Sequence, residues 1–247
     1  MPYNSPGRFI TFEGGEGVGK STQIRLLAQK LRQKGFDVTT TREPGGSPGA
    51  EAVRHVLLTG AAEEFGTRFE ATLFAAARAD HVAQVIRPAI EDGRVVLCDR
   101  FMDSTRVYQG ATGNLEANFV HALERLALNG LTPDLTILLD MPAETGLARA
   151  RARDEPKSPD TRDGATVSGQ EGAPVVPVSD RFEREDLAIH ETRRQAFLDL
   201  AESEPDRFRT IDADQSVEAI ASAVLIAVHS VLPKGAQASR KAGGQGT

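Results

Sequence analysis

Five short apolar runs recur along the chain, and longer segments with a helical repeat separate them. Glycine, proline or charged residues bound each run, as is common for strands of a parallel sheet. We expect strands at residues 8–13, 36–41, 94–99, 134–140 and 207–212. The regular alternation of strands and helical segments predicts an α/β fold, with an open sheet that carries helices on both faces.

The segment from residue 20 to residue 35 is the clearest predicted helix. Its apolar stripe consists of Ile24, Leu27, Ala28 and Leu31. Gly35 can end this helix in the left-handed conformation. A second, longer helical segment covers residues 70–93, and we expect a bend near Pro88, because proline lacks the backbone N–H that a helix interior needs.

Two segments depart from this alternation. Residues 154–180 are rich in proline, glycine, serine and aspartate and lack an apolar period, so we expect a long mobile loop there. The tail at residues 233–247 has a similar composition, and we expect it to be disordered. Residues 1–232, with the lid and inserted loop at about 149–184 among them, are interpreted as one compact domain.

Composition excludes several classes of protein. A length of 247 residues with 40% hydrophobic residues is enough for one substantial core. The net charge of −6 argues against a nucleic-acid or anionic-membrane partner, so a phosphate site would have to be local. Cys98 is the only cysteine, which excludes an intrachain disulfide and suits a cytoplasmic location. The sequence contains no run of about 18 apolar residues, so no membrane span is predicted.

A glycine-rich loop follows the first predicted strand and opens the first predicted helix. Gly14, Gly19, Lys20 and Ser21 match the P-loop pattern G-x-x-x-x-G-K-[ST]. Its glycines let backbone N–H groups face phosphate oxygens, the lysine reaches the outer phosphates, and the serine can bind Mg²⁺. The predicted ATP contacts in this segment are Gly14, Gly15, Glu16, Gly17, Val18, Gly19, Lys20, Ser21 and Thr22.

The third predicted strand ends in Asp99, and Arg100 follows directly. An acid beside Mg²⁺ with an adjacent arginine suits an enzyme that holds a second, acceptor phosphate close to the donor. The Asn-Lys-x-Asp motif of GTPases is not found in the sequence. Two other interpretations remain open at this point: a P-loop kinase for a different small molecule, and a nucleotide-binding protein without turnover.

Several ordered motifs resemble those of the thymidylate kinase family. They lie at residues 41–54, 73–82, 99–110, 133–140 and 149–154, and the resemblance covers roughly residues 8–228. It implies a nucleoside monophosphate kinase fold with a five-stranded parallel sheet, and a homodimer. The implied reaction transfers a phosphoryl group from ATP to dTMP with Mg²⁺, giving dTDP and ADP.

A helix face is predicted to recognise the base. Phe74 and Arg78 are four residues apart, so a ring could stack on a pyrimidine while the guanidinium reaches its edge. Arginine only donates, and it therefore favours the O4 acceptor of thymine over the N4 donor of cytosine. The resemblance adds Thr105 at the N3 side of the base, Tyr108 beneath the sugar and Gln109 beside it.

The acceptor phosphate is assigned to Arg42 and Arg100, since both lie at predicted strand ends, where open α/β sheets place ligands. By resemblance, Glu13 lies near the sugar 3′-hydroxyl and the metal, so the predicted metal ligands are Ser21, Asp99 and Glu13. The resemblance also implies a cis peptide bond before Pro44.

The remaining positive charge is expected from a lid at about residues 149–184, because residues 15–18 contain no arginine. Arg149 and Arg153 would share a helix face, with Arg151 on the other side. By resemblance, Arg153 contacts the transferring phosphoryl group and Arg149 lies nearer the ATP base. About twenty inserted residues precede Arg181 and Arg184, which are the alternative lid arginines.

Overall fold

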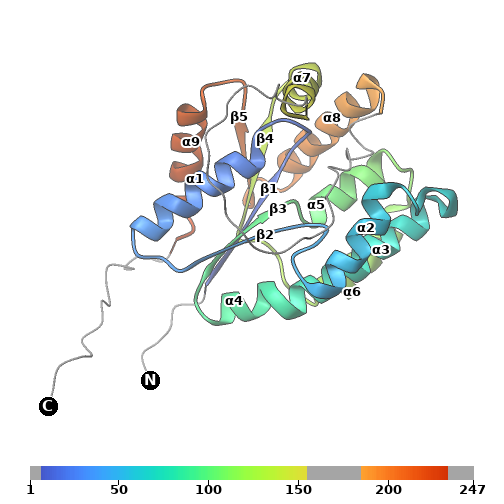
Figure 1. Cartoon of the computed structure of the whole chain (residues 1–247), viewed down its shortest axis with the longest axis horizontal. Helices are drawn as coiled ribbons and strands as arrows, with labels where there is room; N and C mark the ends of the chain where they lie inside the picture. Colours follow the sequence, from blue (N-terminus) through green and yellow to red (C-terminus); the bar gives the residue numbers. More distant parts are fainter. Residues whose placement is uncertain (1–6, 155–184, 233–247) are drawn as a thin grey trace, which may run out of the picture.

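The computed structural model describes residues 7–154 and 185–232. Five parallel strands form one sheet in the order β2-β3-β1-β4-β5 (Figure 1). The strands are β1 (Arg8–Glu13), β2 (Val38–Arg42), β3 (Val95–Asp99), β4 (Leu135–Asp140) and β5 (Phe208–Asp212). The predicted α/β class and five-stranded parallel sheet are confirmed. The expected loop at residues 154–180 and the tail at 233–247 lie almost entirely outside the described residues.

The helices lie in the connections between the strands and cover both faces of the sheet. They are α1 (Lys20–Gln33), α2 (Pro48–Thr59), α3 (Gly66–His81), α4 (Arg87–Glu91), α5 (Met102–Thr105), α6 (Ala117–Leu128), α7 (Ala143–Asp154), α8 (Leu187–Ser203) and α9 (Val217–His229). Three further helical turns are η1 (Glu63–Phe65), η2 (Val82–Ile86) and η3 (Arg106–Ala111). None of the described helices is long and apolar enough to cross a membrane.

Side chains of the central strand β1 point alternately to the two faces of the sheet, so they belong to two separate hydrophobic clusters. Ile10 and Phe12 of β1 face α1 and α9, which cover one side of the sheet (Figure 1). Phe9 packs on the opposite side against η2, α4 and the segment after β3. Both faces are therefore covered, which explains why the strands have nearly continuous apolar sequences.

Two predicted boundaries shift for local reasons. The second strand begins at Val38 rather than residue 36, because the N–H of Phe36 still bonds to the carbonyl of Leu31 and completes the end of α1. Gly35 adopts φ +90°, the left-handed conformation predicted for it. The helical segment predicted at 70–93 begins earlier, at Gly66, and is interrupted by the π-helical turn η2 directly before Pro88. A wider turn accommodates the missing proline N–H.

The carboxyl ends of three strands meet at one edge of the sheet. Phe12 of β1 and Arg42 of β2 are both in register with Asp99 of β3. Because β1 lies next to β4 as well, the loop after β1 has strands on both sides. This edge is where open α/β sheets place their ligands.

Candidate active site

The P-loop runs from the end of β1 to the start of α1. Gly14, Gly17 and Gly19 have φ values of +130°, +68° and +94°, which only glycine adopts without strain. Gly19 occupies the N-cap position of α1, so this helix start has no capping side chain. The first N–H groups of α1 can therefore donate to an anion.

Lys20 lies at the first position of α1 and turns its side chain back into the loop. Its Nζ donates to the carbonyl oxygens of Gly14 at 3.0 Å and Gly15 at 2.7 Å. Burial lowers the pKa of the Lys20 ammonium, and the nearby Arg100 lowers it further, against the attraction of neighbouring carboxylates. The loop thus holds a cation directly beneath the curve of backbone that would receive phosphate.

Ser21 and Asp99 meet at the outer end of the loop. Ser21 Oγ donates a hydrogen bond to Asp99 Oδ2 at 2.7 Å. Ser21 lies on α1, which follows β1, and Asp99 ends β3. Because β1 and β3 are parallel neighbours, their carboxyl ends bring the two residues together. A hydroxyl and a carboxylate at this spacing are oxygen ligands of the type that Mg²⁺ prefers.

Arg100 reaches back over the P-loop because its backbone is left-handed, with φ +63°. Its guanidinium donates to the carbonyl of Gly14 at 3.2 Å and to Glu16 Oε1 at 2.5 Å, with Ser104 Oγ at 3.3 Å. A non-glycine residue with positive φ is uncommon and often occurs at functional sites. This strand-end arginine is therefore joined directly to the donor loop.

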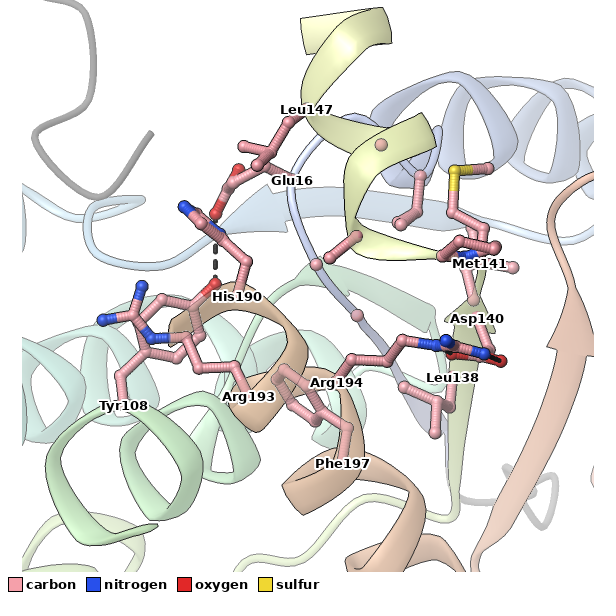
Figure 2. A pocket seen from close by; sticks show the side chains of 17 residues that line it. Glu16, Tyr108, Leu138, Asp140, Met141, Leu147, His190, Arg193, Arg194 and Phe197 are labelled. Carbon is pink, nitrogen blue, oxygen red and sulfur yellow. Dashed lines mark hydrogen bonds and ion pairs between the residues drawn. The ribbon is translucent and has the colours of Figure 1, made fainter. Parts of the chain in front are cut away.

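Glu16 is the acidic side chain of the P-loop. Burial by itself would raise its pKa, but Arg100, Lys20 and the Tyr108 hydroxyl together lower the pKa of Glu16 to about 2. Tyr108 Oη donates to Glu16 Oε1 at 3.1 Å, as the dashed line in Figure 2 shows. The carboxylate is thus charged and held from two directions.

The Glu13 carboxylate, which was predicted near the metal and the sugar, is engaged with protein groups. Its side chain is fully buried, and Oε1 accepts from the N–H of Phe101 at 2.8 Å while Oε2 accepts from Ser104 Oγ at 2.7 Å. Burial, with Asp103 nearby, raises the pKa of Glu13 to about 7. Glu13 instead fixes the turn that follows Arg100, and Glu16 is the less buried acid of this pair.

A pocket lies between the P-loop, the end of β4 and helix α8. Figure 2 shows Glu16, Tyr108, His190 and Arg193 around one side of it. The Tyr108 ring lies between two guanidinium groups, with Arg193 at 4.2 Å and Arg100 at 5.2 Å from its centroid. The ring is only 8% exposed and is thus firmly positioned.

Helix α3 brings the predicted base-recognising residues to the same region. Phe74 is half-buried against the cluster that contains Val107 and Tyr108. Arg78 is almost fully buried; its Nη1 donates to Thr105 Oγ1 at 3.1 Å and its Nη2 to the Phe101 carbonyl at 3.1 Å. The structure therefore joins two of the predicted base-contacting residues, Arg78 and Thr105, by a direct hydrogen bond.

Two other predicted substrate residues are engaged with protein groups. Gln109 is buried and donates through Nε2 to Glu70 Oε1 at 2.6 Å. Arg42, at the end of β2, is exposed and pairs with Glu51 Oε1 at 2.9 Å. Glu51 also accepts the N–H of Gly46, so Arg42 is held beside the turn that follows the cis Glu43–Pro44 bond. The cis bond predicted before Pro44 is present.

Helix α7 carries the lid arginines and touches the P-loop backbone. A Cβ added at Gly17 would collide with the carbonyl of Gly146, and one added at Gly146 would collide with the carbonyl of Glu16. Arg149 donates to the carbonyl of Ala213 at 3.0 Å and pairs with Asp214 at 2.9 Å, between β5 and α9.

The other lid arginines have different positions. Arg151 and Arg153 are exposed on the last turn of α7. Arg153 continues the stripe of Gly146 and Ala150, which faces the P-loop, at spacings of seven and three residues. Arg181 and Arg184 lie outside the described residues.

Sequence reasoning missed three residues of this region. Glu43 and His81 form a buried cluster with Arg78, and Arg193 packs on Tyr108. The spacing of Arg78 and His81, three residues on one helix, was an available signal. Arg193 had none, because α8 joins the site only through the packing of the whole domain.

Comparisons with known proteins agree with this geometry. The family model described as "Thymidylate kinase" matches residues 12–224. The chain is 50% identical over 226 residues to the thymidylate kinase of Bartonella quintana (strain Toulouse), covering 92% of this chain and 97% of that protein. It is 52% identical over 219 residues to the thymidylate kinase of Bartonella henselae, covering 88% of this chain and 93% of the relative.

A solved structure shares the fold. The crystal structure of thymidylate kinase from Ehrlichia chaffeensis superposes with a TM-score of 0.66 at 26% sequence identity. The match covers 91% of this chain and 99% of that one.

Proposed function

The chain belongs to the thymidylate kinase family, and from this we propose that it transfers the γ-phosphoryl group of ATP to dTMP, giving dTDP and ADP. One observation carries the proposal. Arg100 at the end of β3 contacts both the Gly14 carbonyl and Glu16 of the P-loop. An arginine that serves an acceptor phosphate is thereby held against the loop that serves the donor.

The acceptor needs no general base. A phosphate monoester has a second pKa near 6, so it is already an anionic nucleophile at neutral pH. The chain has to align the two phosphates and neutralise the charge of the transferring group. Lys20 and Arg100 supply fixed positive charge, and Arg42 faces the same edge of the sheet.

Base and sugar recognition would use the α3 side of the site. Phe74 stacks on the pyrimidine, and Arg78 with Thr105 addresses its O4 and N3 edge. Tyr108 packs beneath the sugar, where its ring leaves no room for a 2′-hydroxyl. Glu16, which is charged and bonded to Tyr108, takes the role at the 3′-hydroxyl that the resemblance gave to Glu13.

Mg²⁺ is part of the same proposal. Ser21 Oγ and Asp99 Oδ2 lie 2.7 Å apart beside the P-loop and would hold the ion, directly or through water. Two protein oxygens suffice, since Mg²⁺ usually takes its other ligands from water and substrate phosphate. The ion would neutralise charge on the phosphate oxygens. No cluster of three or more metal-binding side chains occurs among the residues that the structure describes.

We further propose that the protein acts as a cytoplasmic homodimer. Phe65 and Phe69 form a ring pair with centroids 5.2 Å apart, and the two residues are 60% and 44% exposed. Leu126 of α6 is 70% exposed, and α3 packs on α6. Large exposed apolar side chains on neighbouring helices favour a protein contact. A second copy of this chain is the partner that the family resemblance implies.

A coupled assay of ADP release tests the catalytic proposal. The enzyme with ATP and Mg²⁺ is given dTMP, dUMP, UMP, dCMP, CMP, AMP or thymidine, each in turn. We expect dTMP to give the highest kcat/KM. A clear preference for any other acceptor would contradict the proposal, and ATP turnover that no acceptor stimulates would indicate a nucleotide-binding protein of another kind.

A further inference from the structure

A buried carboxylate lies between two cationic or polar partners of helix α3. Glu43 Oε2 accepts from Arg78 Nε at 2.6 Å, and Glu43 Oε1 accepts from His81 Nδ1 at 3.0 Å. The three side chains are at most 4% exposed. Arg78 and His81 are three residues apart on α3, so one helix face presents both to Glu43.

The histidine extends the cluster to strand β2. His81 Nε2 lies 2.7 Å from Thr41 Oγ1. Because a carboxylate oxygen can only accept, Nδ1 donates to Glu43, and Nε2 pairs with the threonine hydroxyl. The imidazole is fully buried and bonded at both nitrogens, so its orientation is fixed.

The guanidinium of Arg78 has more N–H donors than its described protein partners use, so donors are left for a ligand. A guanidinium has five N–H donors. Three are used by Glu43, Thr105 and the Phe101 carbonyl. The remaining two sit on Nη1 and Nη2, whose direction is set once Nε is held by Glu43. Thr105 Oγ1 accepts from Arg78 and keeps its own hydrogen to donate.

We propose that Glu43 and His81 are positioning residues for base selection: they fix the plane of Arg78 so that its two remaining N–H groups address the O4 edge of a thymine base. The inference rests on the proposed function, because it deepens the role of Arg78 in that site. Neither Glu43 nor His81 touches the substrate in this account. Both act through Arg78.

The energetics favour positioning over simple stabilisation. A buried ion pair recovers little net stability, since desolvation offsets most of the attraction, and apolar side chains of similar size would pack as well. A charge-assisted bond to Nε does restrict rotation of the guanidinium. Preorganised donors discriminate well, because a wrong base leaves a buried donor without a partner.

The same cluster joins base and phosphate recognition. Asp80, next to His81, accepts from Ser47 Oγ at 2.6 Å and from the N–H of Gly49 at 3.1 Å. These bonds hold the start of α2 against α3. Arg42, the proposed phosphate ligand, lies between Thr41 and Glu43 on the chain. Base and phosphate contacts are therefore built on one fixed frame.

Two amide substitutions at His81 separate the two halves of the cluster. In His81→Asn the side-chain amide can reach the place of Nδ1, so it keeps the bond to Glu43 and loses Thr41. In His81→Gln the amide reaches the place of Nε2, so it keeps Thr41 and loses Glu43. Asparagine removes more volume from this fully buried site and should be the less stable variant.

We expect His81→Gln to raise the KM for dTMP about tenfold and to reduce the dTMP over dCMP preference in kcat/KM by a similar factor, with kcat little changed. His81→Asn should keep the KM for dTMP and the dTMP over dCMP preference within about threefold of wild type, although it should lower the melting temperature more than His81→Gln does. Equal effects of the two variants, or a larger selectivity loss in asparagine, would overturn the inference.

Glu43→Gln decides the question if His81→Gln does not fold. It keeps the shape and one acceptor oxygen, but the other oxygen becomes an NH2 group that cannot accept, and the charge next to Arg78 is lost. The same KM and selectivity changes are therefore expected, and wild-type selectivity would overturn the inference. Failure of the proposed function looks different, because wild-type protein would then show no preference for dTMP before any substitution is made.

Discussion

Glu16 is the side chain through which the P-loop contacts both Arg100 and Tyr108. Its pKa is lowered to about 2 in the folded protein, from 4.5. A lowered carboxyl pKa stabilises the folded state above the unfolded value, and this contribution is lost as pH falls from 4.5 toward 2. At neutral pH it amounts to about 3 kcal/mol.

Glu16→Gln should therefore lower the free energy of unfolding at about pH 6 and make much less difference at about pH 3. Urea unfolding of both proteins at each pH measures this. A stability difference that does not change with pH would show that the charge of Glu16 contributes little. Asp92→Asn is a suitable control, because Asp92 forms only an exposed pair with Arg94.

Tyr108 offers a test of sugar selection. Tyr108→Phe loses the hydroxyl bond to Glu16 but keeps the ring between Arg100 and Arg193, so preference for dUMP over UMP should persist. Tyr108→Ala removes the bulk and should improve UMP relative to dUMP at least severalfold. The ratio of kcat/KM for the two nucleotides is the measurement. An alanine variant that discriminates as well as wild type would contradict the steric account.

Residues of a contiguous local motif are those that a sequence alone can propose for the site. Lys20 and Ser21 belong to one contiguous motif, and the cis Glu43–Pro44 bond was expected by resemblance. The burial of Glu13 could not be predicted, because a strand position does not reveal which way a carboxylate faces once the following turn closes over it. Its partners Phe101 and Ser104 are about ninety residues away along the chain.

Helix α7 carries the first lid arginines and lies against the P-loop. Gly146 and Ala150 face Gly17, and Arg153 continues their stripe one turn further, while Arg149 is held by Ala213 and Asp214. Arg153→Ala should lower kcat by about 10³-fold with little change in the KM for dTMP. Arg149→Ala should act mainly on the KM for ATP, and Arg151→Ala should remain within a few-fold of wild type.

Steady-state kinetics of the three single variants in both substrates measure these effects. If Arg151→Ala lowers kcat most, the helix face that carries Arg153 does not point into the site. If all three changes are mild, Arg181 or Arg184 becomes the better candidate for the phosphoryl contact. That assignment could not be made from sequence, because the inserted residues separate these arginines from α7.

At the level of elements, the apolar runs and the glycine, proline and charged residues that bound them located the strands to within two residues. The interruption at η2 was harder to predict, since a π-helical turn has no periodic signature of its own. Pro88 marked the place, and the wider turn precedes it. The short helix α5 and the turn η3 were not anticipated, because the side-chain bonds of α5 run to distant segments of the chain: Ser104 donates to Glu13 and Asp103 accepts from Arg207.

At the scale of the whole molecule, the exposed ring pair of Phe65 on η1 and Phe69 on α3 predicts an assembly. Phe69→Asp should convert a dimer, with twice the chain mass of 26.5 kDa, into a monomer. Ile226→Asp is the matched control: Ile226 is 73% exposed on α9, at the other side of the sheet (Figure 1). Sedimentation velocity distinguishes the two masses. Dissociation by the control, or a monomeric wild type, would contradict the proposed interface.

The contact between Gly17 and Gly146 restricts how this sequence can change over generations. Each glycine meets the other element's backbone, which cannot turn aside as a side chain can. No second-site change restores the room, since any Cβ at either position narrows the same gap. When both positions are randomised together and the library is selected for growth that depends on this enzyme, sequencing of the survivors should find glycine at both positions. No other pair of residues should support growth.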